Sequence, residues 1–195
     1  VLQHTIEIFE QHPRIDLIAV ILSPEDSVFQ TALSEKVRVF RVGGASRAET
    51  VRNGVSTLLK QGLAEVKDNI LVHDAARCCL PAEALTRLLD EASENDEGGI
   101  LAIPVADTLK RSDGNHHIDE TVARAGLWQA QTPQLFQTAL LHRALSVDDL
   151  SEITDEASAI EKLGIRPRLV QGDTRNLKLT LPQDEYIVRL LLKAV

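Results

Sequence analysis

The sequence predicts an α/β fold with a doubly wound, mainly parallel sheet and a protruding β-arm. Short, continuously apolar runs such as Ile70–Val72 alternate with amphipathic helical stripes, as in successive β-α-β units with right-handed crossovers. The arm is predicted by a different signal. Asp113-Gly114 separates two short strand-like segments in a stretch too polar to have a core of its own. At 195 residues and 44% hydrophobic, the chain is expected to form one domain, 1–195.

The first third of the chain alternates helix and strand. Apolar residues at i, i+4 and i+7 predict a helix over Val1–His12, which has no capping residue ahead of it and which Pro13 ends. The elements expected next are a strand over Leu17–Leu22, a helix over Glu25–Ser34, a strand over Val37–Val42 and a helix from about Ser46 to Gln61, closed by Gly62.

The remaining two thirds keep this rhythm, except at the arm. An isolated two-stranded arm is marginal in water, so it is expected to pack on another subunit. The expected elements are a strand at Ile70–Val72, a helix over Pro81–Ser93, a strand over Ile100–Val105, arm strands at Thr108–Arg111 and Ile118–Val122, a strand over Gly126–Gln131, a helix from Thr132-Pro133 to about Leu145, a helix over Glu156–Leu163, strands at Arg168–Gln171 and Asn176–Leu179, and a terminal helix over Gln183–Ala194 with Tyr186, Leu190 and Leu191 inward.

The charge balance excludes some classes of partner. A net charge of −8 and a pI of about 5.2 argue against a general nucleic-acid or anionic-membrane surface, but not against a small phosphorylated ligand. There is no apolar run of membrane-spanning length and no signal peptide. The only cysteines, Cys78 and Cys79, are adjacent, which leaves no disulfide framework or CxxC site and indicates a reducing, cytoplasmic location.

The first candidate site follows the strand at Ile70–Val72, which its unbroken apolar run predicts to be an interior strand of a parallel sheet. The residues after it are His73, Asp74, two alanines and Arg77. Open α/β sheets bind ligands at the carboxyl ends of their strands. Asp74 is therefore a candidate metal ligand and Arg77 a candidate phosphate contact. An Asp–Arg pair that caps the next helix fits the same residues, and the motif alone favours neither.

Two further candidates carry less weight. The Gly43-Gly44-x-x-Arg47 turn brings backbone N–H groups and a helix N-terminus together, which suits an anion, although an ordinary tight turn is the commoner use of such glycines. Lys178 lies between two leucines and faces either solvent or a ligand cleft. The neighbouring His116 and His117 are interpreted as solvated turn residues, because neighbours in a strand point to opposite faces.

Five motifs together resemble a known family. HDAAR, GGxxR, RxGLWxAxTPQ, TDEA and NxKxT occur here in the order found in 2-C-methyl-D-erythritol 4-phosphate cytidylyltransferases, and the resemblance covers essentially the whole chain. It implies a Rossmann-like nucleotidyltransferase fold and a homodimer with interlocked arms at about 107–125. It also implies the transfer of a cytidylyl group from CTP to the methylerythritol phosphate, with Mg²⁺ and release of pyrophosphate, in the non-mevalonate isoprenoid pathway.

The resemblance also implies roles for individual residues. Thr108 and Arg124 are implied to reach the substrate of the other subunit, and Asp74 to hold the metal. The implied catalytic residues are Asp74, Lys178 and Arg124; the implied nucleotide-binding residues are Gly43, Gly44, Arg47, Thr50, Asp74 and Arg77; the implied substrate-binding residues are Thr108, Arg124, Thr132, Thr154 and Lys178.

Three departures from the family pattern accompany the resemblance. Ala45 replaces an acidic residue that contacts the cytosine amino group in many relatives, and Cys78 replaces a usual proline. The family's N-terminal Gly-rich AAGxGxR loop and its following lysine are not in the sequence, so the domain is expected to be incomplete at its N-terminus. The alternatives are a ribitol-5-phosphate cytidylyltransferase and a non-catalytic nucleotide-binding or dimerisation module. A dinucleotide-binding domain is not favoured, because its glycine fingerprint does not occur in the sequence.

Overall fold

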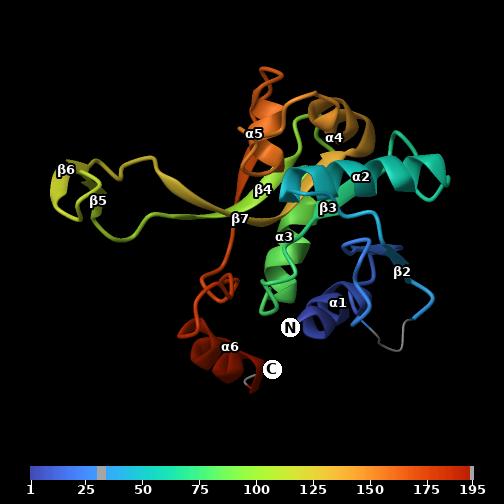
Figure 1. Cartoon of the computed structure of the whole chain (residues 1–195), viewed down its shortest axis with the longest axis horizontal. Helices are drawn as coiled ribbons and strands as arrows, with labels where there is room; N and C mark the ends of the chain where they lie inside the picture. Colours follow the sequence, from blue (N-terminus) through green and yellow to red (C-terminus); the bar gives the residue numbers. More distant parts are fainter. Residues whose placement is uncertain (30–33, 194–195) are drawn as a thin grey trace.

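A four-stranded sheet forms the centre of the molecule (Figure 1). The computed structural model describes residues 1–29 and 34–193. The sheet has the order β3-β7-β4-β8, in which β8 is parallel to β4 and β7 runs antiparallel to both β3 and β4. Three of its strands therefore share one direction, in keeping with the mainly parallel sheet that the sequence predicts. The strands are β3 (Asn69–Val72), β4 (Gly99–Pro104), β7 (Trp128–Gln137) and β8 (Arg168–Gln171).

Helices cover both faces of this sheet. On one face, Leu85 and Leu88 pack with Leu101 and Leu135. On the other face, Phe136 joins a second buried cluster. Since consecutive strand residues point to opposite faces, Leu135 and Phe136 belong to different cores. The first face carries α3 (Ala82–Ala92), and the second carries α2 (Arg47–Lys60), α4 (Thr138–Leu145) and α5 (Glu156–Glu161).

A smaller parallel pair, β1 (Ile18–Ile21) and β2 (Val37–Phe40), packs with α1 (Leu2–Glu10) around its own small core. The helix predicted over Glu25–Ser34 is wrong for residues 25–29, and residues 30–33 lie outside the described ones. In this segment the Asp26 side chain accepts the Phe29 N–H at 3.0 Å.

The largest error in the predicted elements lies at the strand β7. The helix predicted from Thr132-Pro133 begins six residues later, at Thr138, because β7 continues through the proline to Gln137. The apolar pair Leu135 and Phe136 fits a helix stripe as well as a strand covered on both faces. The two helical layers of the folded chain select the strand.

Three smaller expectations are also wrong. In the described residues β3 pairs with β7 alone, antiparallel, so it is not an interior strand between parallel neighbours. Residues 176–179 form no strand, although the Leu179 N–H donates to the Ala76 carbonyl. In α6 (Asp184–Lys193), Tyr186 and Leu190 are 70% and 50% exposed, while Val188 is buried. The predicted last residue of this helix, Ala194, lies outside the described residues.

The predicted arm is confirmed. Strands β5 (Leu109–Ser112) and β6 (Ile118–Val122) form an antiparallel hairpin that projects far from the sheet (Figure 1). Gly114 takes a φ of 88° in its turn, and His117 lies 3.7 Å from Asp113 there, as a solvated turn residue. No helix in the described parts of the chain has the length and apolarity needed to cross a membrane.

Candidate active site

A cavity of about 290 Å³ opens beside the end of β3. Six residues proposed from the sequence line it, and they come from segments far apart in the chain. A larger hollow of about 470 Å³ lies over α3, but one helix alone forms its walls, so it lacks the convergence of elements that a binding site requires. The cavity beside β3 is lined by Arg47, Asp74, Arg77, Ala130, Gln131, Thr132, Gln134, Thr154, Asp155 and Lys178.

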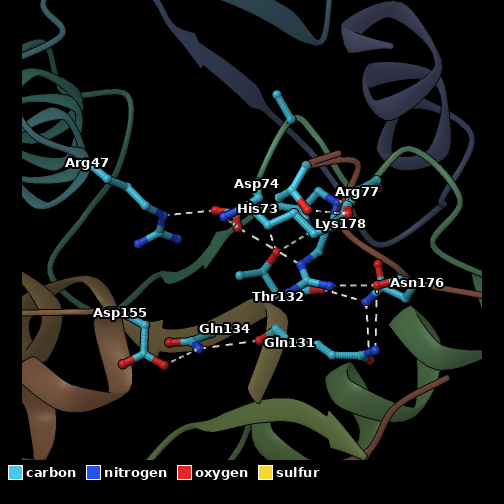
Figure 2. A network of polar contacts seen from close by, with 12 residues as sticks. Arg47, His73, Asp74, Arg77, Gln131, Thr132, Gln134, Asp155, Asn176 and Lys178 are labelled. Atoms are coloured by element: carbon cyan, nitrogen blue, oxygen red, sulfur yellow. Dashed lines mark hydrogen bonds and ion pairs between the residues drawn. The ribbon is translucent and has the colours of Figure 1, made fainter. Parts of the chain in front are cut away.

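Asp74 is the centre of the charged groups in this cavity (Figure 2). Its Oδ1 accepts from Arg47 Nε at 2.8 Å, and its Oδ2 lies 2.9 Å from Lys178 Nζ and 3.9 Å from Arg77 Nε. Burial alone would raise the pKa of Asp74, but the Arg47 and Lys178 cations outweigh it and hold this pKa below its usual value. Asp74 is therefore a carboxylate at neutral pH. The helix-capping alternative is wrong, because the next helix, α3, has Pro81 and not Asp74 at its N-cap.

Arg47 joins Asp74 to a second carboxylate. Its two terminal nitrogens donate to the two oxygens of Glu156, at 2.7 and 3.1 Å. Burial opposes the charge on Arg47, yet the pairs with Glu156 and Asp74 raise its pKa. Burial also raises the pKa of Glu156, while the two Arg47 N–H groups that donate to its oxygens favour the charged form. The result is a bidentate, charge-assisted pair.

A chain of hydrogen bonds supports the backbone of Asp74. The Asp74 N–H donates to Thr132 Oγ1 at 3.0 Å, and this hydroxyl also lies 3.0 Å from His73 Nδ1. The other ring nitrogen of His73 lies 3.0 Å from the Arg77 carbonyl oxygen, so it carries the proton. Burial lowers the pKa of His73 to about 4, so the imidazole is neutral. The ring of Phe9 contacts it edge-on at 5.0 Å.

The Lys178 segment is attached to β7 by buried amides. Asn176, which is fully buried, donates to the Thr132 carbonyl at 2.8 Å, and its own carbonyl accepts from Arg77 at 2.6 Å. Gln131 donates to the Asp173 carbonyl at 2.9 Å. These contacts bring Lys178 to the cavity lining, as the ligand-cleft alternative expects, although its side chain stays 42% exposed.

Side chains at the start of α2 accept hydrogen bonds from the backbone N–H groups of the glycine turn that precedes it. Gly44 N–H donates to Thr50 Oγ1 at 3.0 Å, and Ala45 N–H donates to Glu49 Oε2 at 2.9 Å. Ser46 caps the helix and accepts from Glu49 N–H. Of this candidate group, Arg47 lines the cavity, whereas Gly43, Gly44 and Thr50 stand outside its lining.

The arm residues stand apart from the cavity. Thr108 directly precedes β5, and Arg124 follows the end of β6 by two residues. Both are exposed, and neither lines the cavity of its own chain. Thr154 lines it as an exposed residue, while the Thr132 hydroxyl is taken up by the Asp74 and His73 contacts.

Several groups that shape the site were missed from the sequence. Gln131, Gln134 and Asp155 line the cavity, and Glu156 lies behind it. Gln134 lies in the TPQ motif, and Asp155 and Glu156 lie in TDEA. Nothing local marks a carboxylate that pairs with an arginine 109 positions away.

The chain matches known proteins along nearly its whole length. A family model described as 2-C-methyl-D-erythritol 4-phosphate cytidylyltransferase matches residues 1–194. The protein of that name from Neisseria meningitidis serogroup C (serotype 2a) is 67% identical over 198 residues, which cover 100% of this chain and 86% of the relative. Its counterpart from Chromobacterium violaceum is 47% identical over 193 residues, covering 98% and 84%.

Solved structures show the same fold. A crystal structure of 4-diphosphocytidyl-2C-methyl-D-erythritol synthase superposes with a TM-score of 0.92 at 64% identity, covering 98% of this chain and 89% of that one. The cytidylyltransferase from Thermus thermophilus gives 0.80 at 28% identity, covering 98% and 88%. The family match, the close relatives and the shared fold lead to one conclusion: the chain belongs to the 2-C-methyl-D-erythritol 4-phosphate cytidylyltransferase family.

Proposed function

We propose that this chain transfers the cytidylyl group of CTP to 2-C-methyl-D-erythritol 4-phosphate and releases pyrophosphate, as a step of non-mevalonate isoprenoid biosynthesis. The observation that carries the proposal is the ionised Asp74 with Arg47, Arg77 and Lys178 around it, at the carboxyl end of β3 in a chain of this family. A substrate phosphate oxygen attacks the α-phosphorus of CTP while the bond to the β-phosphate oxygen breaks. Such a displacement depends mainly on positioning and charge neutralisation.

The donor set fits Mg²⁺ when the nucleotide supplies the other ligands. In the part of the chain that the structure describes, His, Cys, Asp and Glu do not gather in threes as a ready-made metal site. Mg²⁺ is commonly bound by one or two carboxylates together with substrate phosphates and waters, so Asp74 is the residue that would hold it. When bound, the ion would neutralise charge on the triphosphate.

The remaining cavity residues would orient the substrates. Lys178 is half-exposed and paired with Asp74 Oδ2 through one ion pair, so its ammonium group can turn toward a substrate phosphate at little cost. Arg77 lines the cavity, and its cationic guanidinium would contribute positive charge beside a phosphate there. Thr154 contributes an exposed hydroxyl at the cavity.

We further propose a homodimer through the arm at about 107–125. The hairpin projects from the body, and its β5 and β6 residues are mostly exposed (Figure 1). Thr108 and Arg124 lie at its base, away from the cavity of their own chain, where a partner's cavity could receive them. Replacing residues 110–121 with a short Gly-Ser turn should give a monomer in light scattering that still binds CTP with Mg²⁺. A dimer that persists would exclude the arm as its basis.

The activity test is pyrophosphate release by the full-length protein with CTP, Mg²⁺ and either methylerythritol phosphate or ribitol 5-phosphate. Release with the former alone is the expected result. Release with ribitol 5-phosphate alone would replace the substrate, and CTP binding without release would favour a non-catalytic module. Asp74→Ala should reduce turnover by about 1,000-fold or more, and retention of the wild-type rate would remove Asp74 from the mechanism. The cytoplasmic location stays a prediction.

A further inference from the structure

Glu156 is the most deeply buried charged group near the cavity. Its side chain is 1% exposed, and it is the first residue of α5. A carboxylate in this position needs a partner, because removing it from water without one is costly. Arg47 supplies that partner with both terminal nitrogens. Glu156 itself does not line the cavity, so it is not placed to touch a ligand there.

The bidentate pair with Glu156 fixes the orientation of the Arg47 guanidinium. A guanidinium is a rigid planar fork, so fixing its two terminal nitrogens also fixes where its Nε–H points. That third donor points at Asp74 Oδ1, 2.8 Å away. The contacts therefore connect the start of α5, the start of α2 and the end of β3 in one line, Glu156–Arg47–Asp74.

Glu156 is itself held in place by the sheet. Gln134 of β7, which is 1% exposed, accepts the Ala157 N–H at 2.9 Å and donates to Asp155 Oδ2 at 2.9 Å. Asp155 and Ser158 form a reciprocal capping box at the same helix start. The backbone that carries Glu156 is thus attached to the strand that forms the cavity wall.

We propose that Glu156 is a positioning residue: through Arg47 it holds Asp74 Oδ1 and leaves Oδ2 as the carboxylate oxygen available to a ligand. The two oxygens of Asp74 then differ in how firmly their partners are held. Oδ1 is held by an arginine that a buried carboxylate retains, while Oδ2 faces Lys178, which is 42% exposed. The kinetic part of this proposal rests on the proposed function; the structural part does not.

The kinetic test is Glu156→Gln in the full-length protein, with Glu161→Gln as the matched control at an exposed position of the same helix. Loss of a supporting partner of this kind typically costs 10- to 100-fold in activity. We expect kcat to fall by about that factor, with KM for methylerythritol phosphate changed by less than about 2-fold, and the control to keep wild-type values. A wild-type kcat in Glu156→Gln would overturn the proposal.

A double-mutant cycle tests whether Glu156 acts through Arg47. Arg47→Lys keeps the charge but removes the fork. If Glu156 acts by orienting the fork, its loss adds little once the fork is gone, so the double variant should be about as active as Arg47→Lys alone. Losses that multiply would overturn the proposed connection. Should Glu156→Gln fail to fold, Glu156→Asp replaces it in the cycle, because it keeps the charge but is one carbon too short to maintain the same grip.

A spectroscopic measurement separates this proposal from the proposed function. In ligand-free protein, the Arg47 Nε–H resonance should be protected from solvent exchange, and Glu156→Gln should abolish that protection while Glu161→Gln keeps it. Protection that survives in Glu156→Gln would overturn the structural part. If the wild-type protein releases no pyrophosphate, the proposed function fails, and the resonance still decides whether Glu156 holds Arg47.

Discussion

The two sides of Asp74 differ in how their cations are held. On the Oδ1 side, Arg47 stands at the start of a helix and is paired with a buried carboxylate. On the Oδ2 side, Lys178 stands on a segment without strand pairing and is half-exposed. A cation that pairs with a buried carboxylate stabilises the folded state, because removing the cation leaves a buried charge without a partner. A cation at an exposed pair contributes little to stability and is free to serve a ligand.

The largest effect on this comparison should come from Arg47→Ala. It leaves Glu156 buried without its partner, so the free energy of unfolding in urea should fall by about 3–5 kcal/mol. Arg52→Ala is the control on the same helix, since its pair with Glu49 at 3.4 Å is of the surface kind and is worth about 0–1 kcal/mol. An equally small loss for Arg47→Ala would show that Arg47 contributes no more to the unfolding free energy than a surface ion pair does.

Lys178→Ala should show the opposite profile. Its ion pair with Asp74 is partly exposed, so unfolding free energy should change by less than about 1 kcal/mol. Turnover should fall by about 100-fold or more, as when a charged group that stabilises the transition state is removed. Steady-state kinetics and urea unfolding of the same preparation separate the two effects. Lys162→Ala, which breaks an exposed pair with Glu152, is the control. A wild-type kcat/KM in Lys178→Ala would contradict the assignment of Lys178 to a ligand.

The last predicted effect concerns His73, whose ring contacts the Thr132 hydroxyl and the Arg77 carbonyl oxygen. Burial lowers its pKa from 6.5 to about 4 in the folded protein, so between these values the unfolded chain binds more protons. Stability should therefore rise as pH increases from about 4 to 6.5, by about 2 kcal/mol from this group after allowance for partial exposure. His73→Gln cannot titrate and should lose that part of the pH dependence. Metal-free unfolding curves at several pH values measure it, and parallel profiles for the two proteins would contradict the neutral state of His73 in the folded protein.

The sequence was informative where the signal is local. The start of α2 after Gly43-Gly44, the arm turn at Asp113-Gly114 and the polar end of β3 at Asp74 all lie where the residues themselves indicate. These features depend on turn chemistry and caps, which act over a few residues.

The sequence was less informative where the fold decides. Leu135 and Phe136 fit a helix until two helical layers cover the sheet, and Tyr186 fits an inward position until the packing leaves it exposed. Glu156 and Gln134 gain their meaning from partners that are distant in sequence. Such contacts have no signature within a short window of residues.

The base of the arm has a consequence for how the site is completed. The pairing of β4 with β7 ends at Pro104 and Trp128, with one more bond from Val105 N–H to the Leu127 carbonyl, and the arm pairing begins at Leu109 and Val122. Thr108 and Arg124 fall between these two paired regions, so they belong to the joint and not to either rigid part. Their direction follows the direction of the arm. If a second chain holds the arm, folding alone leaves the substrate site unfinished and association finishes it, so dilution should reduce specific activity while circular dichroism stays unchanged.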